Sequence, residues 1–453
     1  MIQRVLIANR SEIAVRIIRA CKEMGIETVA VYSQADKEAL HVQMADQAVC
    51  IGASLASESY LNMNNLIQAA CLTGCDAIHP GFGFLSENSR FARLVQECGL
   101  TWIGPRPEVI EQLGNKTEAR KMMAAKGVPI IPGMSKALSS EQEGLSVADE
   151  IGYPIILKAS NGGGGKGMRV VRSETEFQDA YYQTKSEAKQ FFGDEDVYIE
   201  KFIENPKHIE VQLAGDRYGN CVHFYERDCS FQIDNQKMME EAPCSCLSEA
   251  QRAALVESAC KACKAAKYDS VGTVEFLFDG NQHYFMEMNT RIQVEHPITE
   301  MITGIDLIAL QIRLAQDDPL PFTQAQIHKN GVAIECRINA EDVHHDFHGC
   351  AGKIRFYHCP GGNGIRVDSG IYSGYEVPPF YDSMLCKIIA YAPNRKACIQ
   401  KMKGALEEII VDGIETNEEF LYLALFQEDF LKGSYDTSMA AKFYQQCKKE
   451  ELL

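Results

Sequence analysis

The sequence predicts an α/β protein with more than one domain. The chain has 453 residues, which is too long for a single compact core, so two or three domains are expected. Residues 1–33 read as strand, helix and strand, the βαβ unit from which parallel sheets are built. Residues 271–300 read instead as an antiparallel hairpin that carries several acidic side chains.

Composition excludes several classes of protein. Hydrophobic residues make up 46% and charged residues 24% of the chain, as in soluble globular proteins. The formal net charge of −17 argues against nucleic acid and anionic membrane surfaces as main partners. No signal peptide opens the chain and no apolar run reaches membrane-spanning length, so we expect a cytoplasmic protein.

The 17 cysteines do not form an evident metal site. Cys260 and Cys263 match C-x-x-C, but no second such pair or histidine pair completes a zinc site. Cys244 and Cys246 lie in a predicted loop. We expect reduced thiols that fill core space.

The N-terminal segment predicts a doubly wound domain that ends near residue 113. Residues 4–8 form a first strand, Ser11 is a candidate helix N-cap, and residues 28–32 form a second strand. Strand-like and glycine-rich segments continue to alternate through Trp102. No G-x-G-x-x-G follows the first strand, so a dinucleotide site is not expected.

A glycine-rich stretch follows the strand at residues 153–158. Four consecutive glycines, Gly162 to Gly165, could be a flexible linker or a hairpin loop that closes over a ligand. Strand-like runs flank them on both sides, which favours the loop. Glycines let backbone N–H groups approach a polyphosphate, and Lys158 and Lys166 supply positive charge. The Gly-Lys-Ser/Thr of a Walker loop is absent.

Two further segments carry adjacent polar groups on strands. Residues 197–202 include Glu200 and Lys201, and residues 207–212 alternate polar and apolar around His208. Such groups at a strand end could read an adenine edge. His208 by itself would more often be a structural histidine than a ligand contact.

The predicted hairpin pairs two strands, residues 273–278 and 284–288, around a turn-like Asp-Gly-Asn-Gln. Each strand carries one glutamate, Glu275 and Glu287. Because side chains alternate between faces, these two can pair only across a connection of three or five residues; a four-residue loop places them on opposite faces.

Polar residues then recur at every second position. In an extended segment Glu287, Asn289, Arg291, Gln293 and Glu295 share one face. This could be a solvated face, but apolar residues on both sides of Glu275 predict burial. Two buried carboxylates ~4 Å apart repel by about 4 kcal/mol at an effective dielectric of ~20, so a cation is expected between them. Two carboxylates and an amide oxygen suit Mg²⁺.

These segments together resemble the biotin carboxylase members of the ATP-grasp superfamily, over nearly the whole chain. The resemblance rests on EKFIENPKHIE, ERDCS, QK and EEAP, EFLF, EMNTRIQVEHPITEMITG, ECRINAED and YDSM, together with the strand, glycine loop and strand. It implies an N-terminal αβα domain (residues 1–113), an ATP-grasp domain (114–330) with a mobile glycine-rich lid (131–203), and an α+β C-terminal domain (331–453).

The resemblance also implies the reaction and its groups. ATP and bicarbonate would form carboxyphosphate, which supplies carbon dioxide to the ureido nitrogen of biotin. Glu295 would be the general base, and Arg337 would bind biotin and stabilise charge on its ureido oxygen. Glu275, Glu287 and Asn289 would hold Mg²⁺ or Mn²⁺. Bicarbonate would contact Lys237, Arg291, Gln293, Val294 and Glu295. ATP would contact Lys116, Lys158, Gly162, Gly163, Gly164, Gly165, Lys166, Gly167, Glu200, Lys201, Ile203, His208, Gln232 and Leu277.

Three positions in one stretch depart from the family pattern. Ile233 stands where arginine is usual, Asp234 where a basic or amide residue is common, and Asn235 where histidine is frequent. Phe347 to Gly352 lacks the usual proline-containing turn, and Asn161 replaces a small residue. A lost cation beside a phosphate site would weaken ATP or bicarbonate binding. We expect activity to survive, because the metal, base and bicarbonate positions match.

Motifs that this chain lacks predict which other proteins it works with. There is no Ala-Met-Lys-Met biotinylation motif, so biotin would arrive on a separate biotin carboxyl carrier protein, and the chain leaves no room for a carboxyltransferase. We expect one subunit, often a homodimer in this family, of a multi-subunit enzyme, most commonly acetyl-CoA carboxylase in fatty acid synthesis. The alternatives are another ATP-grasp carboxylate–amine ligase, which would not explain Arg291 to Glu295 with Arg337, and a non-catalytic ATP-binding homologue.

Overall fold

The computed structural model describes residues 1–453 except 135, 160–166, 193–194, 451 and 453. The chain begins with a parallel sheet, which confirms the α/β prediction. Five strands lie in the order β3-β2-β1-β4-β5, and β1 pairs in parallel with both β2 and β4. The elements of this region are β1 (Arg4–Ile7), α1 (Ser11–Glu23), β2 (Glu27–Ser33), α2 (Leu40–Met44), β3 (Gln47–Gly52), α3 (Met63–Leu72), β4 (Ala77–His79), α4 (Ser89–Glu97), β5 (Thr101–Trp102) and α5 (Pro107–Gly114).

The first helix begins one residue earlier than predicted. Its N-cap is Arg10, in extended conformation, and Ser11 is already helical. The Arg10 guanidinium does not cap the helix; its Nε and Nη2 donate to the two carboxylate oxygens of Asp36, each at 2.7 Å. The expectation of a Ser11 N-cap was therefore wrong, although the helix itself was predicted.

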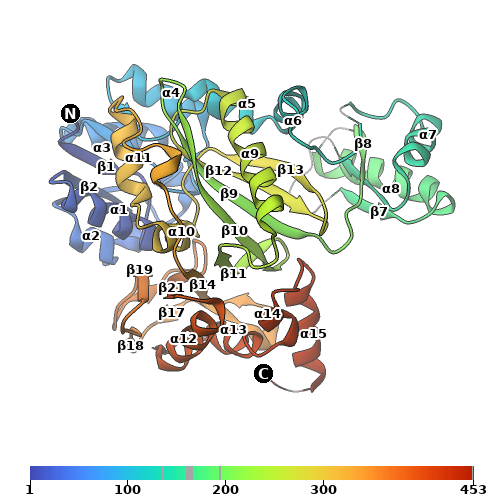
Figure 1. Cartoon of the computed structure of the whole chain (residues 1–453). Coiled ribbons are helices and arrows are strands. Elements are labelled where there is room, and N and C mark those ends of the chain that lie inside the picture. The colour runs from blue at the N-terminus through green and yellow to red at the C-terminus, as the bar shows by residue number, and fades with distance from the viewer. Residues whose placement is uncertain (135, 160–166, 193–194, 451, 453) are drawn as a thin grey trace.

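A small α/β unit follows and projects from the main body, at the right of Figure 1. Its antiparallel sheet has the order β7-β6-β8. Leu157 pairs with Arg169 across β6 and β7, so the two strands that flank the glycine run do form a hairpin. The elements are α6 (Lys116–Ala125), α7 (Glu141–Ile151), β6 (Ile155–Ala159), β7 (Met168–Val171), α8 (Glu174–Phe192) and β8 (Val197–Lys201). Gly162 to Lys166 lie outside the described residues.

The centre of the molecule is an eight-stranded sheet in the order β13-β12-β9-β10-β11-β14-β21-β19. Its strands are β9 (Lys207–Gly215), β10 (Cys221–Ile233), β11 (Gln236–Ala242), β12 (Val271–Phe278), β13 (His283–Asn289), β14 (Val332–Asn339), β19 (Ile365–Ser369) and β21 (Met384–Ala392). Glu240 of β11 pairs with Glu335 of β14. The predicted boundary at residue 330 therefore falls between strands of one continuous sheet.

Helices cover this sheet and build its cores. Helix α9 packs on β9 and β10, and α12 packs on β14 and β21 (Figure 1). The helices are α9 (Glu249–Ala266), α10 (His296–Thr303), α11 (Leu307–Ala315), α12 (Arg395–Glu408), α13 (Glu418–Ala424), α14 (Glu428–Lys432) and α15 (Met439–Glu450). Short elements complete the chain: η1 (Gln34–Asp36), η2 (Ala56–Glu58), η3 (Gln324–Gln326), η4 (Val343–His345), β15 (Glu341–Asp342), β16 (His348–Gly349), β17 (Gly352–Lys353), β18 (Phe356–His358), β20 (Glu376–Val377) and β22 (Ile410–Asp412).

Two properties of the whole chain bear on the predictions. Among the described residues, no helix combines the length and apolar character needed to cross a lipid bilayer. All 17 cysteines are free thiols, and several of them, including Cys229, Cys336 and Cys386, are buried in the core.

Candidate active site

A cleft of about 1320 Å³ runs between the small sheet and the eight-stranded sheet. Side chains from β6 and β8 line one side, and side chains from β9 to β14 line the other. Almost all of the predicted site residues line this one cleft: Lys116, Lys158, Glu200, Lys201, Ile203, His208, Gln232, Lys237, Glu275, Leu277, Glu287, Asn289, Arg291, Gln293, Val294, Glu295 and Arg337. Gly167 is described but is not among the lining residues.

The two predicted metal glutamates face each other across β12 and β13. Glu275 pairs with Glu287, although the connection between the strands, residues 279–282, has four residues. The loop-length rule was therefore wrong here. Phe276 pairs with Phe285, so Met286 is an extra residue in β13. This β-bulge shifts the register by one and returns both glutamates to the same face.

The alternating face does not continue as a strand. Strand β13 ends at Asn289, and Glu295 lies at the N-cap of α10. The expectation of an extended segment through residue 295 was wrong. Even so, Arg291, Gln293 and Glu295 all line the cleft.

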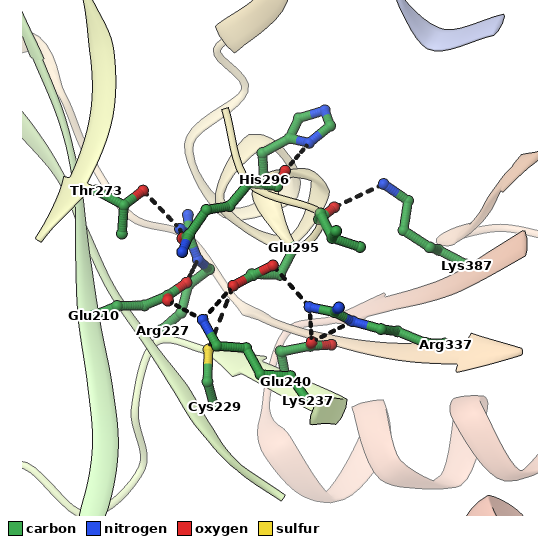
Figure 2. A network of polar contacts seen from close by, with 12 residues as sticks. Glu210, Arg227, Cys229, Lys237, Glu240, Thr273, Glu295, His296, Arg337 and Lys387 are labelled. Atoms are coloured by element: carbon green, nitrogen blue, oxygen red, sulfur yellow. Dashed lines mark hydrogen bonds and ion pairs between the residues drawn. The ribbon is translucent and has the colours of Figure 1, made fainter. Parts of the chain in front are cut away.

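Lys237 is the central cation of the cleft. Its Nζ lies 2.6 Å from Glu210 Oε2, 3.0 Å from Glu275 Oε1 and 2.7 Å from Glu295 Oε1. Figure 2 shows Glu295 between Lys237 and Arg337, whose Nη2 donates to Glu295 Oε2 at 2.8 Å. Arg337 Nε also donates to Glu240 Oε1 at 2.7 Å. Glu295 thus bridges two cations; Lys237 has two further carboxylate partners and Arg337 has one.

This arrangement fixes the charge of its members. Burial by itself would lower the pKa of Lys237, but Glu210, Glu275 and Glu295 outweigh it and raise that pKa well above its usual value. Burial opposes the ionised form of Glu295, yet Lys237 and Arg337 hold its pKa well below the usual value. Glu240 differs: burial, reinforced by Glu295 and opposed by Arg337, raises its pKa to about 7.

A buried arginine holds the network from behind. The Arg227 side chain is fully buried, and its guanidinium donates to Glu210 Oε1 and to Thr273 Oγ1 at 3.2 Å (Figure 2). It also donates to Gln293 Oε1 at 2.7 Å. A guanidinium with its donors satisfied in a plane fixes the partners in one arrangement. Arg227 therefore orients both Glu210, the partner of Lys237, and the predicted bicarbonate ligand Gln293.

The opposite side of the cleft holds the predicted nucleotide groups. Lys158 Nζ lies 2.6 Å from Glu200 Oε2, and Arg120 pairs with the same carboxylate. Lys201 behaves differently, because its Nζ donates to the carbonyls of Gly152 and Tyr153 at 3.0 and 3.1 Å. Its ammonium is therefore engaged outside the predicted contact, and its backbone N–H donates to the carbonyl of Pro132 at 2.8 Å.

The stretch that departs from the family pattern is a tight hairpin. Asp234 and Asn235 have φ of 51° and 65° and join β10 to β11, where Ile233 pairs with Gln236. Two left-handed residues in a two-residue loop are typical of a type I′ turn. Asp234 and Asn235 line the cleft, whereas Ile233 is half-buried and packs against the C-terminal core.

Several functional contacts had no sequence signal that identified them. Glu87, in a loop of the N-terminal region, accepts from Arg291 Nε at 3.1 Å. Arg120 lies on helix α6 and Arg227 lies on strand β10. Neither arginine stands at a spacing that sets it apart as a site residue. Glu210 was visible in the alternation of residues 207–212, but only the register of β9 against β10, where Glu210 pairs with Arg227, shows its role.

Comparisons with known proteins identify the relatives of this chain. The family model "Biotin carboxylase, N-terminal domain" matches residues 1–110, "Carbamoyl-phosphate synthase L chain, ATP binding domain" matches 115–323, and "Biotin carboxylase C-terminal domain" matches 335–442. Biotin carboxylase 1 of Bacillus subtilis is 52% identical over 439 residues, 96% of this chain and 98% of that protein. The chain belongs to the biotin carboxylase family.

Solved biotin carboxylases have the same fold. A β,γ-ATP complex from Campylobacter jejuni is 46% identical and superimposes with a TM-score of 0.92, covering 98% of this chain and 99% of that one. The biotin carboxylase domain dimer of Hydrogenobacter thermophilus 2-oxoglutarate carboxylase, solved with MgADP, ADP and bicarbonate, is 46% identical with a TM-score of 0.91 and the same coverage. These likenesses confirm the predicted ATP-grasp fold.

The residues present fit a magnesium ion. Glu275 and Glu287 offer hard oxygen donors from paired strands. Glu275 Oε1 now accepts from Lys237, Asn289 Nδ2 and Gln293 Nε2, the last two at 2.9 and 2.7 Å. Glu287 Oε2 lies 3.0 Å from Lys116 Nζ. Both carboxylates are thus paired with cations or amide donors, the environment that a divalent cation would replace.

Proposed function

We infer that this chain is an ATP-dependent ligase that carboxylates biotin with bicarbonate. Family membership over nearly the whole length supports this assignment. The single structural observation that carries it is Glu295, held between Lys237 and Arg337 at 2.7 and 2.8 Å. A carboxylate–amine ligase of the same superfamily has no evident use for a base bridged between an anion-binding lysine and an arginine at the cleft floor.

In our proposal, each group of residues has a separate role. Lys116, Lys158, Glu200, Lys201, Ile203, His208, Gln232 and Leu277 surround ATP. Glu275, Glu287 and Asn289 hold Mg²⁺, which neutralises phosphate charge when bound. Lys237, Arg291, Gln293 and Val294 position bicarbonate. Phosphoryl transfer depends chiefly on such positioning and charge neutralisation.

Glu295 accepts the bicarbonate proton in this proposal. Its low pKa keeps it ionised, as a proton acceptor must be, but a strongly depressed pKa also makes it a weak base. Bicarbonate in the cleft would share the charge of Lys237, and the ureido oxygen of biotin would share that of Arg337. Each interaction reduces the stabilisation of ionised Glu295 by Lys237 and Arg337. Substrate binding itself would therefore raise the pKa of Glu295 and make it a stronger base.

The partners follow from the same assignment. We propose that biotin arrives on a biotin carboxyl carrier protein and that a carboxyltransferase subunit takes the carboxyl group onward, most commonly to acetyl-CoA. We further propose a homodimer, in line with the dimer of the Hydrogenobacter domain, and a cytoplasmic location. A regulatory homologue without catalysis is the alternative that the Ile233–Asn235 departure suggests.

The first test is ATP hydrolysis with Mg²⁺ and bicarbonate, with and without free biotin. We expect Glu295→Gln to lower the biotin-stimulated rate by about a hundredfold to ten-thousandfold, the usual contribution of a general base. Glu97→Gln, an exposed glutamate of α4, is the control and should leave the rate unchanged. Hydrolysis indifferent to biotin and bicarbonate would favour the carboxylate–amine ligase, and tight ATP binding without turnover would favour the regulator.

A further inference from the structure

A pair of thiols lies outside the cleft, directly after β11. Cys244 is buried and Cys246 is exposed, and their Sγ atoms are 3.3 Å apart. The backbone of Cys244 is held on both sides: its N–H donates to Glu226 Oε1 at 3.2 Å, and its carbonyl accepts from Arg252 Nη2 at 3.1 Å. These backbone hydrogen bonds therefore hold Cys244 in the position where its sulfur contacts that of Cys246.

Charged groups around the pair distinguish the two sulfurs. Cys244 Sγ donates to Asp228 Oδ2 at 3.4 Å, and Lys207 Nζ lies 2.7 Å from that same oxygen. The sulfur–sulfur contact with Cys244 and the charge of Lys207 lower the pKa of Cys246, although burial opposes this. For Cys244, burial and the neighbouring Cys246 and Asp228 raise the pKa well above its usual value. The exposed sulfur is the nucleophile, and the buried one keeps its proton.

We propose that Cys244 and Cys246 form a reversible oxidation site for hydroperoxides. In the first step the Cys246 thiolate attacks one peroxide oxygen; an S–O bond forms, the O–O bond breaks, and the departing oxygen takes a proton from solvent. In the second step Cys244 Sγ attacks the sulfenic sulfur of Cys246. The S–S bond forms, the S–O bond breaks, and the Cys244 proton leaves with the hydroxyl as water. The two thiols lose two electrons and the peroxide gains them.

Asp228, Cys244 and Cys246 also lie close enough together to hold a metal ion. Lys207 argues against this use. Its ammonium already occupies Asp228 Oδ2, the oxygen nearest to Cys244, and its positive charge repels a cation brought to the same place. The same charge favours a thiolate at Cys246, so it supports oxidation and opposes metal binding.

Hydrogen bonds connect the thiol pair to the cleft, so oxidation of the pair should affect ligand binding in the cleft. Asp228 Oδ1 accepts from Ser230 Oγ at 2.5 Å, and Ser230 Oγ accepts from the backbone N–H of His208 at 3.0 Å. His208 Nε2 in turn contacts Glu275 Oε2 at 3.0 Å. A disulfide removes the S–H donor of Cys244 from Asp228 at the far end of this series. We therefore expect oxidation to weaken ATP binding, an expectation that rests on the proposed nucleotide site.

Peptide mapping of the full chain tests the chemistry. The reduced protein is titrated with hydrogen peroxide, blocked with an alkylating reagent and digested without reductant. We expect the peptide that contains Cys244 and Cys246 to lose two hydrogen atoms before the exposed thiol Cys98 reacts, and to regain them with dithiothreitol. Oxidation of Cys98 first, with both loop thiols still free, would overturn the proposal.

Two variants separate the roles of the sulfurs. Cys244→Ser should leave Cys246 to accumulate as a sulfenic acid that dimedone traps, whereas Cys246→Ser should leave Cys244 unmodified. Cys98→Ser is the matched control and should behave as the native chain. Zinc that copurifies in equimolar amount and is released by Cys244→Ser would assign the pair to a metal and overturn the oxidation site.

Calorimetric titration with ATP tests the connection to the cleft. The reduced chain must bind ATP, which tests the proposed function separately. The oxidised chain should bind at least twofold more weakly and recover after reduction, while Cys246→Ser should bind equally before and after peroxide. Equal affinity of the oxidised and reduced native chain would overturn the connection.

Discussion

At the scale of single residues, the site is an arrangement of buried charges that compensate one another. Glu210, Glu275 and Glu295 surround Lys237, and Arg337 joins Glu295 to Glu240. Burying an unpaired charge is strongly unfavourable, so removal of one member changes the protonation of the others. Sequence reasoning identified most of these residues individually. Their charges depend on neighbours from distant parts of the chain, such as Arg227 for Glu210.

Glu240 should give the native state a specific pH dependence. Its pKa is raised from 4.5 to about 7 by burial, so the folded state binds its proton more tightly than the unfolded state does. Its protonated form favours folding at low pH, and this contribution is lost as pH rises from about 4.5 to 7. Across that range, the unfolding free energy of the native chain should therefore fall by roughly 3 kcal/mol relative to that of the Glu240→Gln variant.

Urea unfolding at a series of pH values measures this difference. Glu97→Gln serves as the control, and its curve should run parallel to that of the native chain. A parallel curve for Glu240→Gln as well would mean that Glu240 is ionised throughout the range and would contradict the prediction.

At the scale of elements, small irregularities decide which side chains meet. The bulge at Met286 returns Glu287 to the face of Glu275 despite a four-residue loop. The two-residue turn at Asp234 and Asn235 brings β11 back beside β10, so that Lys237 pairs with Gln232. Strand alternation predicted which residues were polar and inward-facing, but it carried no signal for an inserted residue. A bulge changes only the pairing between strands, which is not a local property of either strand.

The turn gives a prediction at this scale. Asn235 has φ of 65°, a conformation that costs a residue with a Cβ about 1–2 kcal/mol unless it is Asn or Asp. Asn235→Ala should lower the unfolding free energy by about 1 kcal/mol and raise the KM for ATP, because the turn joins the strand that carries Gln232, a proposed ATP contact, to the strand beside it. Asn235→Gly should retain both properties. Chemical denaturation and ATP titrations check these outcomes, and equal effects of alanine and glycine would show that the backbone conformation is not the cause.

At the scale of the whole molecule, the site depends on contacts between regions that are far apart in the sequence. Lys387 of β21 is fully buried, lies 3.2 Å from Glu12 of α1 and donates to the carbonyl of Val294 at 2.7 Å. Arg16 of α1 and Arg366 of β19 both pair with Glu300 of α10. The N-terminal region, the ATP-grasp region and the C-terminal strands are thus joined directly behind Val294 and Glu295.

A double-mutant cycle tests this joint. Glu12→Gln and Lys387→Met should each lower the unfolding free energy, because each leaves a buried charged group without its partner. The double variant should lose less than the sum of the two, with a coupling energy of about 1–3 kcal/mol. The exposed pair Glu428 and Lys432 on α14 is the matched control and should show no measurable coupling. Additive effects of Glu12 and Lys387 would contradict the prediction.

The sequence by itself determined the fold class and the family, and nearly every site residue that it predicted within the described part of the chain lines the cleft, because periodicity and motif composition are local properties. It missed the bulge at Met286, the end of the strand at Asn289, and the contributions of Glu87, Arg120 and Arg227. Tertiary structure alone decided which carboxylates share Lys237, why Glu240 and Glu295 have opposite pKa shifts, and that Cys244 meets Cys246 beside Lys207. Each of these depends on burial and on distances between strands whose register no single segment specifies.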